Sequence, residues 1–163
     1  MKVNVLVTQL NNHVLLPEYK TEFAACMDLY ANLTTENDIR EIKLGSKYKQ
    51  DNDGKVLLKP TGRVLIPTGI KVAIPEGFKM TVKPRSGLTI HDGIVAILGT
   101  IDSDYRGEIG IIIYNHSDTV FVIKNNDRLA QLELEQIIFC EWEIVKKLPE
   151  TQRGEGGFGH TGK

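Results

Sequence analysis

The sequence contains little that would indicate a metal centre, a disulfide scaffold or a surface for non-specific nucleic-acid binding. Its two cysteines, Cys26 and Cys140, are far apart, and the four histidines form no HxxxH or HExxH pattern. We therefore expect free thiols in a reducing compartment and no transition-metal centre built from protein ligands alone. Twenty basic and 21 acidic residues give a net charge of −1, whereas a duplex-binding surface needs a marked basic excess.

Long apolar runs are also missing. No segment approaches the roughly 18 apolar residues of a membrane-spanning helix, and the opening MKVNVLVT is too short for a secretory signal. The sequence thus predicts a cytoplasmic protein with no membrane and no nucleic-acid partner. Its length suits one domain with a single core, which we assign to residues 1–150.

Long helices are not expected, because prolines and glycines interrupt the middle of the chain every few residues. Short β-rich runs lie between these turn signals and predict an all-β fold, either a closed barrel or a jelly-roll-like sandwich. One helix is predicted at Ser86–His91, with Ser86 as its N-cap and Asp92-Gly93 as its end. The predicted strands are Val3–Val7, Val64–Ile66, Gly69–Ile74, Lys79–Val82, Ile94–Leu98, Ile109–Tyr114, Val120–Ile123, Leu129–Leu134 and Phe139–Val145.

A polar hairpin insertion is predicted at about residues 45–59. Its centre, Lys47–Lys55, is wholly polar apart from one tyrosine, and Asp53-Gly54 is a strong hairpin turn signal. The segment is expected to project into solvent. It is either a tolerated surface loop or a docking surface for a regulatory protein partner.

Residues 151–163 form a glycine-rich tail. Because glycine loses much conformational freedom on ordering, we expect a mobile segment that only a ligand organises. Arg153 can donate two hydrogen bonds to a phosphate group, and Phe158 offers a flat face for a base or sugar. The tail is therefore interpreted as a lid for a phosphorylated, ring-bearing ligand, with an inert disordered end as the alternative.

Two further segments concentrate polar groups near turns. Pro84–Leu88 (PRSGL) combines a cation, a hydroxyl and a glycine N–H at the start of the predicted helix, which suits either an anion or plain helix capping. Gly99–Gly107 (GTIDSDYRG) places two acids, a tyrosine and an arginine in one hairpin. One carboxylate there could deprotonate a water and the tyrosine could pack on a sugar, or the acids could simply cap turn N–H groups.

Two strand segments carry isolated polar residues. Asn126–Leu132 (NDRLAQL) contains Gln131, and Ala24–Tyr30 (AACMDLY) contains Asp28. Side chains of this kind among apolar neighbours need polar partners. Arg128 and Asp28 could pair with each other.

Taken in order, the five segments resemble the motifs of the trimeric dUTPase family, the deoxyuridine 5'-triphosphate nucleotidohydrolases, over nearly the whole chain. The matches are Ala25–Tyr30, Pro84–Leu88, Gly99–Gly107, Asn126–Leu132 and Thr151–Gly162. The resemblance implies a distorted jelly-roll, β-clip-like barrel with one short helix and a flexible tail. It also implies a homotrimer in which three chains share each active site.

The activity implied by the resemblance is Mg²⁺-dependent hydrolysis of dUTP to dUMP and pyrophosphate by in-line attack of water on the α-phosphorus. This reaction keeps uracil out of DNA and supplies dUMP for thymidylate synthesis. Asp102 would activate the water, and Asp28 would hold Mg²⁺ through a water molecule. The implied phosphate-binding residues are Arg85, Ser86, Gly87, Gln131, Arg153, Gly159, His160 and Thr161, and those for uracil and deoxyribose are Gly99, Ile101, Tyr105 and Phe158.

Four positions depart from the family pattern. Cys26 and Asn126 stand where the motifs usually have glycine, His160 stands where the tail usually has serine, and Ala96 stands where some relatives carry asparagine. Asn126 is a mild change, since asparagine tolerates positive φ. Two alternative functions are a dCTP deaminase, which would need a glutamate where Asp102 stands, and a non-catalytic regulatory nucleotide-binding protein.

Overall fold

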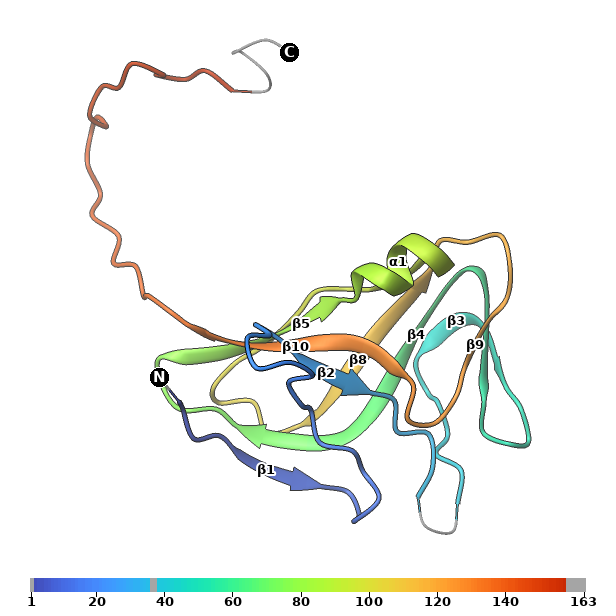
Figure 1. The fold of residues 1–163 in the computed structure, drawn as a ribbon. Coiled ribbons are helices and arrows are strands. Elements are labelled where there is room, and N and C mark those ends of the chain that lie inside the picture. The colour runs from blue at the N-terminus through green and yellow to red at the C-terminus, as the bar shows by residue number, and fades with distance from the viewer. Residues whose placement is uncertain (1, 36–37, 158–163) are drawn as a thin grey trace.

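The computed structural model describes residues 2–35 and 38–157 of the chain. Two antiparallel sheets pack against each other, and one short helix lies at the end of one of them (Figure 1). The larger sheet has the order β1-β4-β8-β6, with β3 and β9 also paired to β4, and the smaller one has the order β2-β10-β5-β7. The elements are β1 (Leu6–Gln9), β2 (Met27–Tyr30), β3 (Gly45–Gln50), β4 (Val56–Ala73), β5 (Phe78–Pro84), α1 (Ser86–Asp92), β6 (Ile94–Ala96), β7 (Gly99–Ile101), β8 (Glu108–Asn115), β9 (Phe121–Ile123) and β10 (Arg128–Gln136).

This arrangement confirms the predicted jelly-roll-like fold. The alternative of a closed barrel is wrong, because neither sheet closes on itself in the part of the chain that the structure describes. Also within these residues, no helix has the length and apolar character needed to cross a bilayer.

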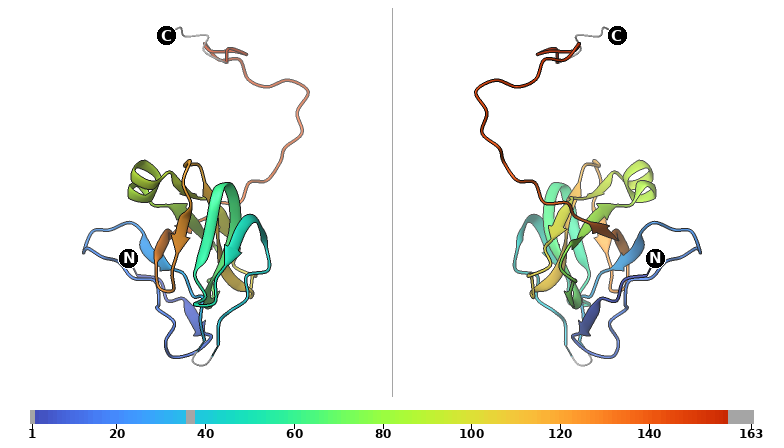
Figure 2. Two further views of the ribbon diagram at one scale, coloured as in Figure 1. Left: turned by 90° about the vertical axis from the view of Figure 1, so that its right-hand side faces the viewer. Right: turned by 90° about the vertical axis from the view of Figure 1, so that its left-hand side faces the viewer.

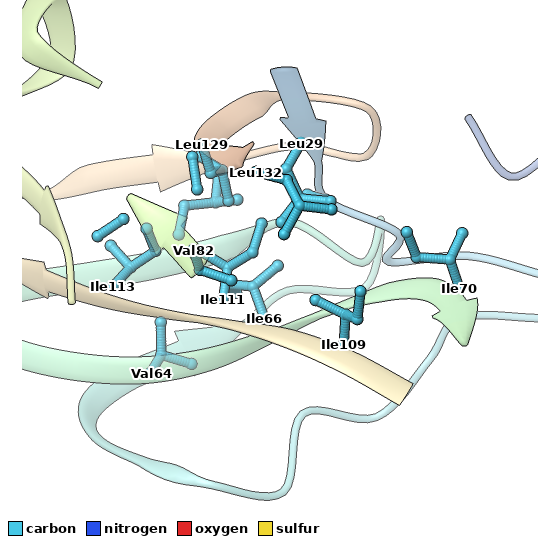
Figure 3. Packing of buried hydrophobic residues seen from close by; sticks show 14 of the residues in the cluster. Leu29, Val64, Ile66, Ile70, Val82, Ile109, Ile111, Ile113, Leu129 and Leu132 are labelled. Atoms are coloured by element: carbon cyan, nitrogen blue, oxygen red, sulfur yellow. The ribbon is translucent and has the colours of Figure 1, made fainter. Parts of the chain in front are cut away.

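The core lies between the two sheets because their strands alternate apolar and polar residues. Ile109, Ile111 and Ile113 of β8 are all buried and face Val82 and Leu132 of the smaller sheet (Figure 3). Fully burying one such side chain contributes roughly 1.5–3 kcal/mol. Ile112, which lies between Ile111 and Ile113, is 42% exposed, so the faces follow the pleat of the strand even where the run is apolar throughout.

β4 runs through a position where the sequence predicts a break. Val64–Ile66 and Gly69–Ile74 were expected as separate strands on either side of Pro67, yet they belong to one strand. Pro67 lies opposite Gly110, and the pairing with β8 shifts before Lys71. The proline, which lacks an N–H group, is therefore accommodated at the edge of a bulge that takes up the intervening residues.

The predicted strand Ile94–Leu98 is also corrected. β6 ends at Ala96 in the larger sheet, and β7 begins at Gly99 in the smaller one. The chain therefore crosses between the sheets at Ile97–Leu98. At the other end of the chain, the predicted strand Val3–Val7 begins later, at Leu6.

The predicted helix forms, with one correction at its start. Arg85 occupies the N-cap position without a side-chain hydrogen bond, so Ser86 is the first helical residue and not the cap. The helix ends where predicted, because Gly93 takes a left-handed φ of 65° and its N–H group bonds to the last turn.

The polar segment forms the predicted hairpin between β3 and β4, in which the Asp51 carboxylate accepts hydrogen bonds from the N–H groups of Asp53 and Lys55. Two hydrogen bonds also attach the segment to the chain that precedes β3. The Tyr48 hydroxyl donates to the carbonyl of Ile42 at 2.8 Å, and the Gln50 amide donates to that of Arg40 at 2.8 Å. The hairpin is therefore a paired part of the larger sheet.

The predicted strand Phe139–Val145 is absent. After Ile137 the chain leaves the two sheets as an extended arc, which stands away from them in all three ribbon views (Figures 1 and 2). Ile138, Trp142 and Ile144 are 95%, 88% and 98% exposed. A β-rich run needs a sheet edge for its hydrogen bonds, and within one chain this segment has none among the described residues. Exposed apolar segments of this kind are typical of interaction surfaces.

The β4 bulge yields a prediction about stability. Gly69 and Gly77 both have positive φ, 75° and 81°, but a Cβ at Gly69 would lie 2.7 Å from Val14 Cγ2, whereas at Gly77 it would meet nothing within 4 Å. Gly69→Ala is therefore expected to lower the free energy of unfolding by about 1–3 kcal/mol more than Gly77→Ala, the usual cost of overpacking. Urea unfolding of both variants measures the difference, and equal losses would contradict the steric argument.

Candidate active site

Three neighbouring strands bring the first polar cluster together. Gln131 of β10 lies opposite Asp28 of β2 on one side and opposite Lys83 of β5 on the other. Arg85 directly follows β5, and Arg128 begins β10. The antiparallel register therefore assembles segments that are about a hundred residues apart in the chain.

Asp28 is the buried centre of this cluster, with a side chain only 7% exposed. Arg128 Nη1 donates to Asp28 Oδ2 at 3.1 Å, and Arg85 Nε lies 3.9 Å from Asp28 Oδ1. Arg85 Nη1 also donates to the carbonyl of Arg128 at 2.5 Å. A buried carboxylate is costly without partners. Of the alternatives that the sequence left open, Asp28 pairs with Arg128 and also lies near the neighbouring Arg85.

An open hollow adjoins the cluster and adds residues that the sequence did not single out. Arg85 and Arg128 line it together with Lys124, Asp127 and Phe121. The sequence held a weak signal for Lys124, since this cation stands two residues before the Asn126 turn. Asn126 has a φ of 65°, which confirms the expected tolerance of positive φ at this turn.

The start of α1 is open to a ligand. Ser86 and Gly87 are both exposed, and a Cβ at Gly87 would meet nothing within 4 Å. Since Ser86 caps no backbone group, its hydroxyl is available to an external acceptor.

The hairpin after β7 forms the second part of the candidate site. The Tyr105 N–H group donates to the carbonyl of Asp102 at 3.2 Å, and Arg106 Nη1 donates to the carbonyls of Ser103 and Tyr105 at 2.6 and 2.8 Å. These bonds hold the turn in shape and leave the Asp102 side chain exposed. Ile101, by contrast, is buried, so only its main chain is positioned to contact a base.

Tyr105 stands over Gly107. A Cβ at Gly107 would lie 2.2 Å from the Tyr105 hydroxyl oxygen, so the ring fills the space that glycine leaves free. The hydroxyl donates to the carbonyl of Glu108 at 3.0 Å. Ala96, in contrast, is 2% exposed and lies in the core, where its side chain offers nothing to a ligand.

One chain does not bring the two parts together. β5 and β7 are antiparallel, with Val82 opposite Gly99 and Met80 opposite Ile101. Asp102 therefore follows the end of β7 that lies near Lys79, six residues along β5 from Arg85. At 3.2–3.4 Å per residue this is a separation of about 20 Å.

The tail is the third, separate part. Arg153 lies in the arc that leaves the sheets (Figure 1), where its Nε donates to the carbonyl of Gly156 at 2.8 Å. Phe158, Gly159, His160 and Thr161 lie outside the described residues. The predicted site residues are thus distributed over three places in one chain.

Among the described residues, no group of three or more His, Cys, Asp and Glu side chains gathers to hold a metal ion. Asp28 is the carboxylate beside the arginine cluster. A single carboxylate suits Mg²⁺ that arrives on substrate phosphates, because this ion keeps several waters and uses one or two protein carboxylates.

The two-sheet jelly-roll arrangement defines the class of fold, on which the polar clusters lie in separate places. Comparison with known sequences gives the family. The dUTPase family profile matches residues 53–162. The chain is also 44% identical, over 162 residues, to the deoxyuridine 5'-triphosphate nucleotidohydrolase of Syntrophotalea carbinolica, covering 98% of this chain and 97% of that one. The chain therefore belongs to the dUTPase family.

Solved structures agree on the fold. A dUTPase of Staphylococcus bacteriophage 80alpha with dUPNHPP has a TM-score of 0.79 at 24% identity, covering 99% of this chain and 100% of that one. A mutant dUTPase from phage phi11 of S. aureus, described with a structural Mg(II) ion, has a TM-score of 0.68 at 23% identity, covering 89% and 98%.

An ion pair at the base of the hairpin was not foreseen from the sequence. Arg40 Nη1 and Nη2 donate to Glu108 Oε1 and Oε2 at 2.8 and 2.7 Å, and the Gly69 N–H group donates to Oε1 at 2.6 Å. Burial by itself would raise the pKa of Glu108, but the bonds from Arg40 and Gly69 hold it below its ordinary value. We call these three residues the Arg40–Glu108 clasp.

The clasp predicts a pH-dependent contribution to stability. Because the pKa of Glu108 is lower in the folded than in the unfolded chain, its contribution is present above the unfolded value of about 4.3 and is lost as pH falls through the folded value. The urea midpoints of wild type and Glu108→Gln should therefore differ at pH 7 and converge as the pH falls through the folded value. Both proteins are compared at one concentration, and a pH-independent difference would contradict the assignment.

Proposed function

We propose that this chain hydrolyses dUTP to dUMP and pyrophosphate in active sites that three copies of the chain share. The observation that carries the proposal is the separation of Asp102 from Arg85 by about 20 Å along β5 within one chain. Residues that lie so far apart act on one nucleotide only when different copies supply them. The family membership and the exposed apolar segment after β10 support the same assembly.

The cluster around Asp28 would bind the phosphate chain of Mg–dUTP. Arg85, Ser86, Gly87 and Gln131 donate hydrogen bonds to phosphate oxygens, and Asp28 accepts from the waters around the metal. When bound, the metal neutralises phosphate charge. Arg85 already lies beside the hollow and needs only to exchange its bond to the Arg128 carbonyl for a phosphate oxygen.

The Gly99–Tyr105 hairpin of a second copy would supply the general base, bind the base and the sugar of the nucleotide, and position the attacking water. The exposed Asp102 carboxylate takes a proton from the water that attacks the α-phosphorus, a contribution of roughly 10²–10⁴ in rate. The main chain at Gly99 and Ile101 contacts uracil and leaves no room for the methyl group of thymine. Tyr105 packs on the deoxyribose, where a 2'-hydroxyl would clash.

The tail would close the site from a third copy. Arg153 and the Gly159–Thr161 segment bind the γ-phosphate end, and Phe158 covers the uracil. Ordering a glycine-rich segment is costly, so closure occurs only over the bound triphosphate. The docking role of Lys47–Lys55 for a regulatory protein partner and the cytoplasmic location stay predictions.

The activity is tested by pyrophosphate release from dUTP, with dCTP, dTTP and UTP as competing substrates, with and without Mg²⁺. Wild-type protein should strongly prefer dUTP over the other three nucleotides, and Asp102→Asn should lose at least about 10²-fold in kcat, the value of a general base. Asp104→Asn is the matched control, because this exposed acid in the same turn should retain activity. A chain truncated after Gln152 should lose activity through loss of the lid. Ammonia release from dCTP, or binding of dUTP without turnover, would contradict the proposal.

Shared sites are tested by mixing two inactive variants, Asp102→Asn and Arg85→Gln. After joint unfolding and refolding in equal amounts, some sites receive an intact Arg85 from one copy and an intact Asp102 from another. Random mixing in closed trimers should restore about a quarter of wild-type activity. Mixing without unfolding controls for exchange, and no recovery after refolding would place both residues in the same chain's site.

A further inference from the structure

Glu108 connects the second part of the candidate site to the body of the fold. It is the first residue of β8 and directly follows the hairpin that carries Asp102 and Tyr105. Its carbonyl accepts the bond from the Tyr105 hydroxyl, and its carboxylate accepts the bonds of the Arg40–Glu108 clasp. One residue therefore links the Tyr105 ring to a guanidinium that is 68 positions earlier in the chain.

We propose that Arg40 and Glu108 are positioning residues that set the place of the Tyr105 ring and thereby the discrimination between deoxyribose and ribose. This inference rests on the proposed function, in which Tyr105 packs on the sugar. Neither Arg40 nor Glu108 contacts the nucleotide in that arrangement. Both act through the hairpin.

Where the hairpin joins β8, the backbone pairing with β4 is irregular, and side-chain hydrogen bonds hold Glu108. Gly110 lies opposite Pro67 and Glu108 lies opposite Lys71, so the residues between Pro67 and Lys71 bulge out of the regular pairing. The Glu108 carboxylate accepts the N–H group of Gly69 in this bulge. The buried Thr68 hydroxyl likewise donates to the carbonyl of Ile109 at 2.6 Å. These side-chain bonds replace regular ladder bonds where the hairpin leaves the sheet.

Arg40 ties the same point to buried structure. Its Nη1 also donates to the Asn32 side-chain oxygen at 2.8 Å, and Asn32 is 4% exposed. The Asn32 N–H group in turn donates to the carbonyl of Pro67 at 2.8 Å. The side chains of Arg40 and Glu108 are only 17% and 29% exposed, so their bidentate pair is partly shielded from water. The clasp thus fixes Glu108 against the larger sheet and against the segment that follows β2.

The Tyr105 ring has little independent support. The residue is 45% exposed, and its ring is held by the hydroxyl bond to Glu108 and by the fit over Gly107. A shift of the main chain at Glu108 therefore moves the ring. Steric rejection of a hydroxyl group depends on the ring position, and misplacements of about 1 Å in such sites cost up to about 10²-fold.

The test compares three variants that disturb the ring by different routes. Glu108→Gln keeps the shape but loses the charged bidentate pair, Arg40→Lys keeps the charge but loses the fork geometry, and Gly107→Ala displaces the ring directly with the clasp intact. Ile66→Val, a truncation of a fully buried residue of β4, is the control for lost stability alone. For each protein we would measure kcat and KM for dUTP and UTP, the Kd of a non-hydrolysable dUTP analogue and of its ribose counterpart, and the Tm.

In Glu108→Gln we expect the dUTP-to-UTP ratio of kcat/KM to fall about tenfold or more, mainly through a higher KM for dUTP and a gain for UTP. Arg40→Lys should show a smaller fall and Gly107→Ala at least as large a fall. Ile66→Val should keep the wild-type ratio although its Tm drops. The Kd of the dUTP analogue should rise, and the Kd of its ribose counterpart should fall.

One outcome would contradict the inference alone, and another would contradict the proposed function as well. A Glu108→Gln protein with a lowered Tm but the wild-type ratio would show that the clasp is structural only, and the inference would be wrong. Wild-type protein that binds neither analogue would overturn the proposed function, and the inference with it. The binding measurements separate the two cases without relying on turnover.

Discussion

The antiparallel pairing of β5 with β7 is the constraint on which the rest of the molecule depends. It places Gly99 beside Val82 and sends Asp102 toward the far end of β5, away from Arg85. No side-chain movement closes a gap of about 20 Å along a sheet. This separation is the basis for our proposal that several copies of the chain complete one site around a nucleotide. The extended arc after β10, with its exposed Ile138, Trp142 and Ile144, presents the apolar surface that such an assembly needs.

The charge balance around Asp28 explains how the first cluster remains folded without a ligand and still attracts one. Asp28 contributes one negative charge against the two positive charges of Arg85 and Arg128, so the buried carboxylate is neutralised. Asp127 also lines the adjoining hollow and offsets part of the positive charge there. Lys124 adds another cation on the wall of the hollow. Lys83 does not add to this field, because it is paired with Glu133 and Glu135. An incoming phosphate group thus meets arginines that buried structure has already placed.

Local patterns in the sequence correctly predicted features that depend only on neighbouring residues. Turn signals placed the strand at Ile109–Tyr114 and the helix end at Asp92-Gly93, and the tolerance of asparagine for positive φ accounted for Asn126. The predictions failed where the local structure depends on a partner that is distant in the sequence. Phe139–Val145 has the composition of a strand but finds no edge within one chain, and Pro67 is accommodated because a bulge removes the need for its missing N–H group. The resemblance gave the site residues, whereas their separation into three places required the strand register.

The Arg40–Glu108 clasp illustrates why the residues that support a site are harder to find in a sequence than those that act in it. Motif residues gather in short segments because they converge on one ligand. Arg40 and Glu108 instead meet beside an irregularity of the backbone, the β4 bulge at Gly69. The sequence near each of them resembles an ordinary charged surface segment. Their partly buried bidentate geometry distinguishes them from the exposed pair of Lys147 and Glu150, whose side chains are 78% and 84% exposed and which should contribute little. Selectivity for a sugar then depends on a bond network that the nucleotide never touches.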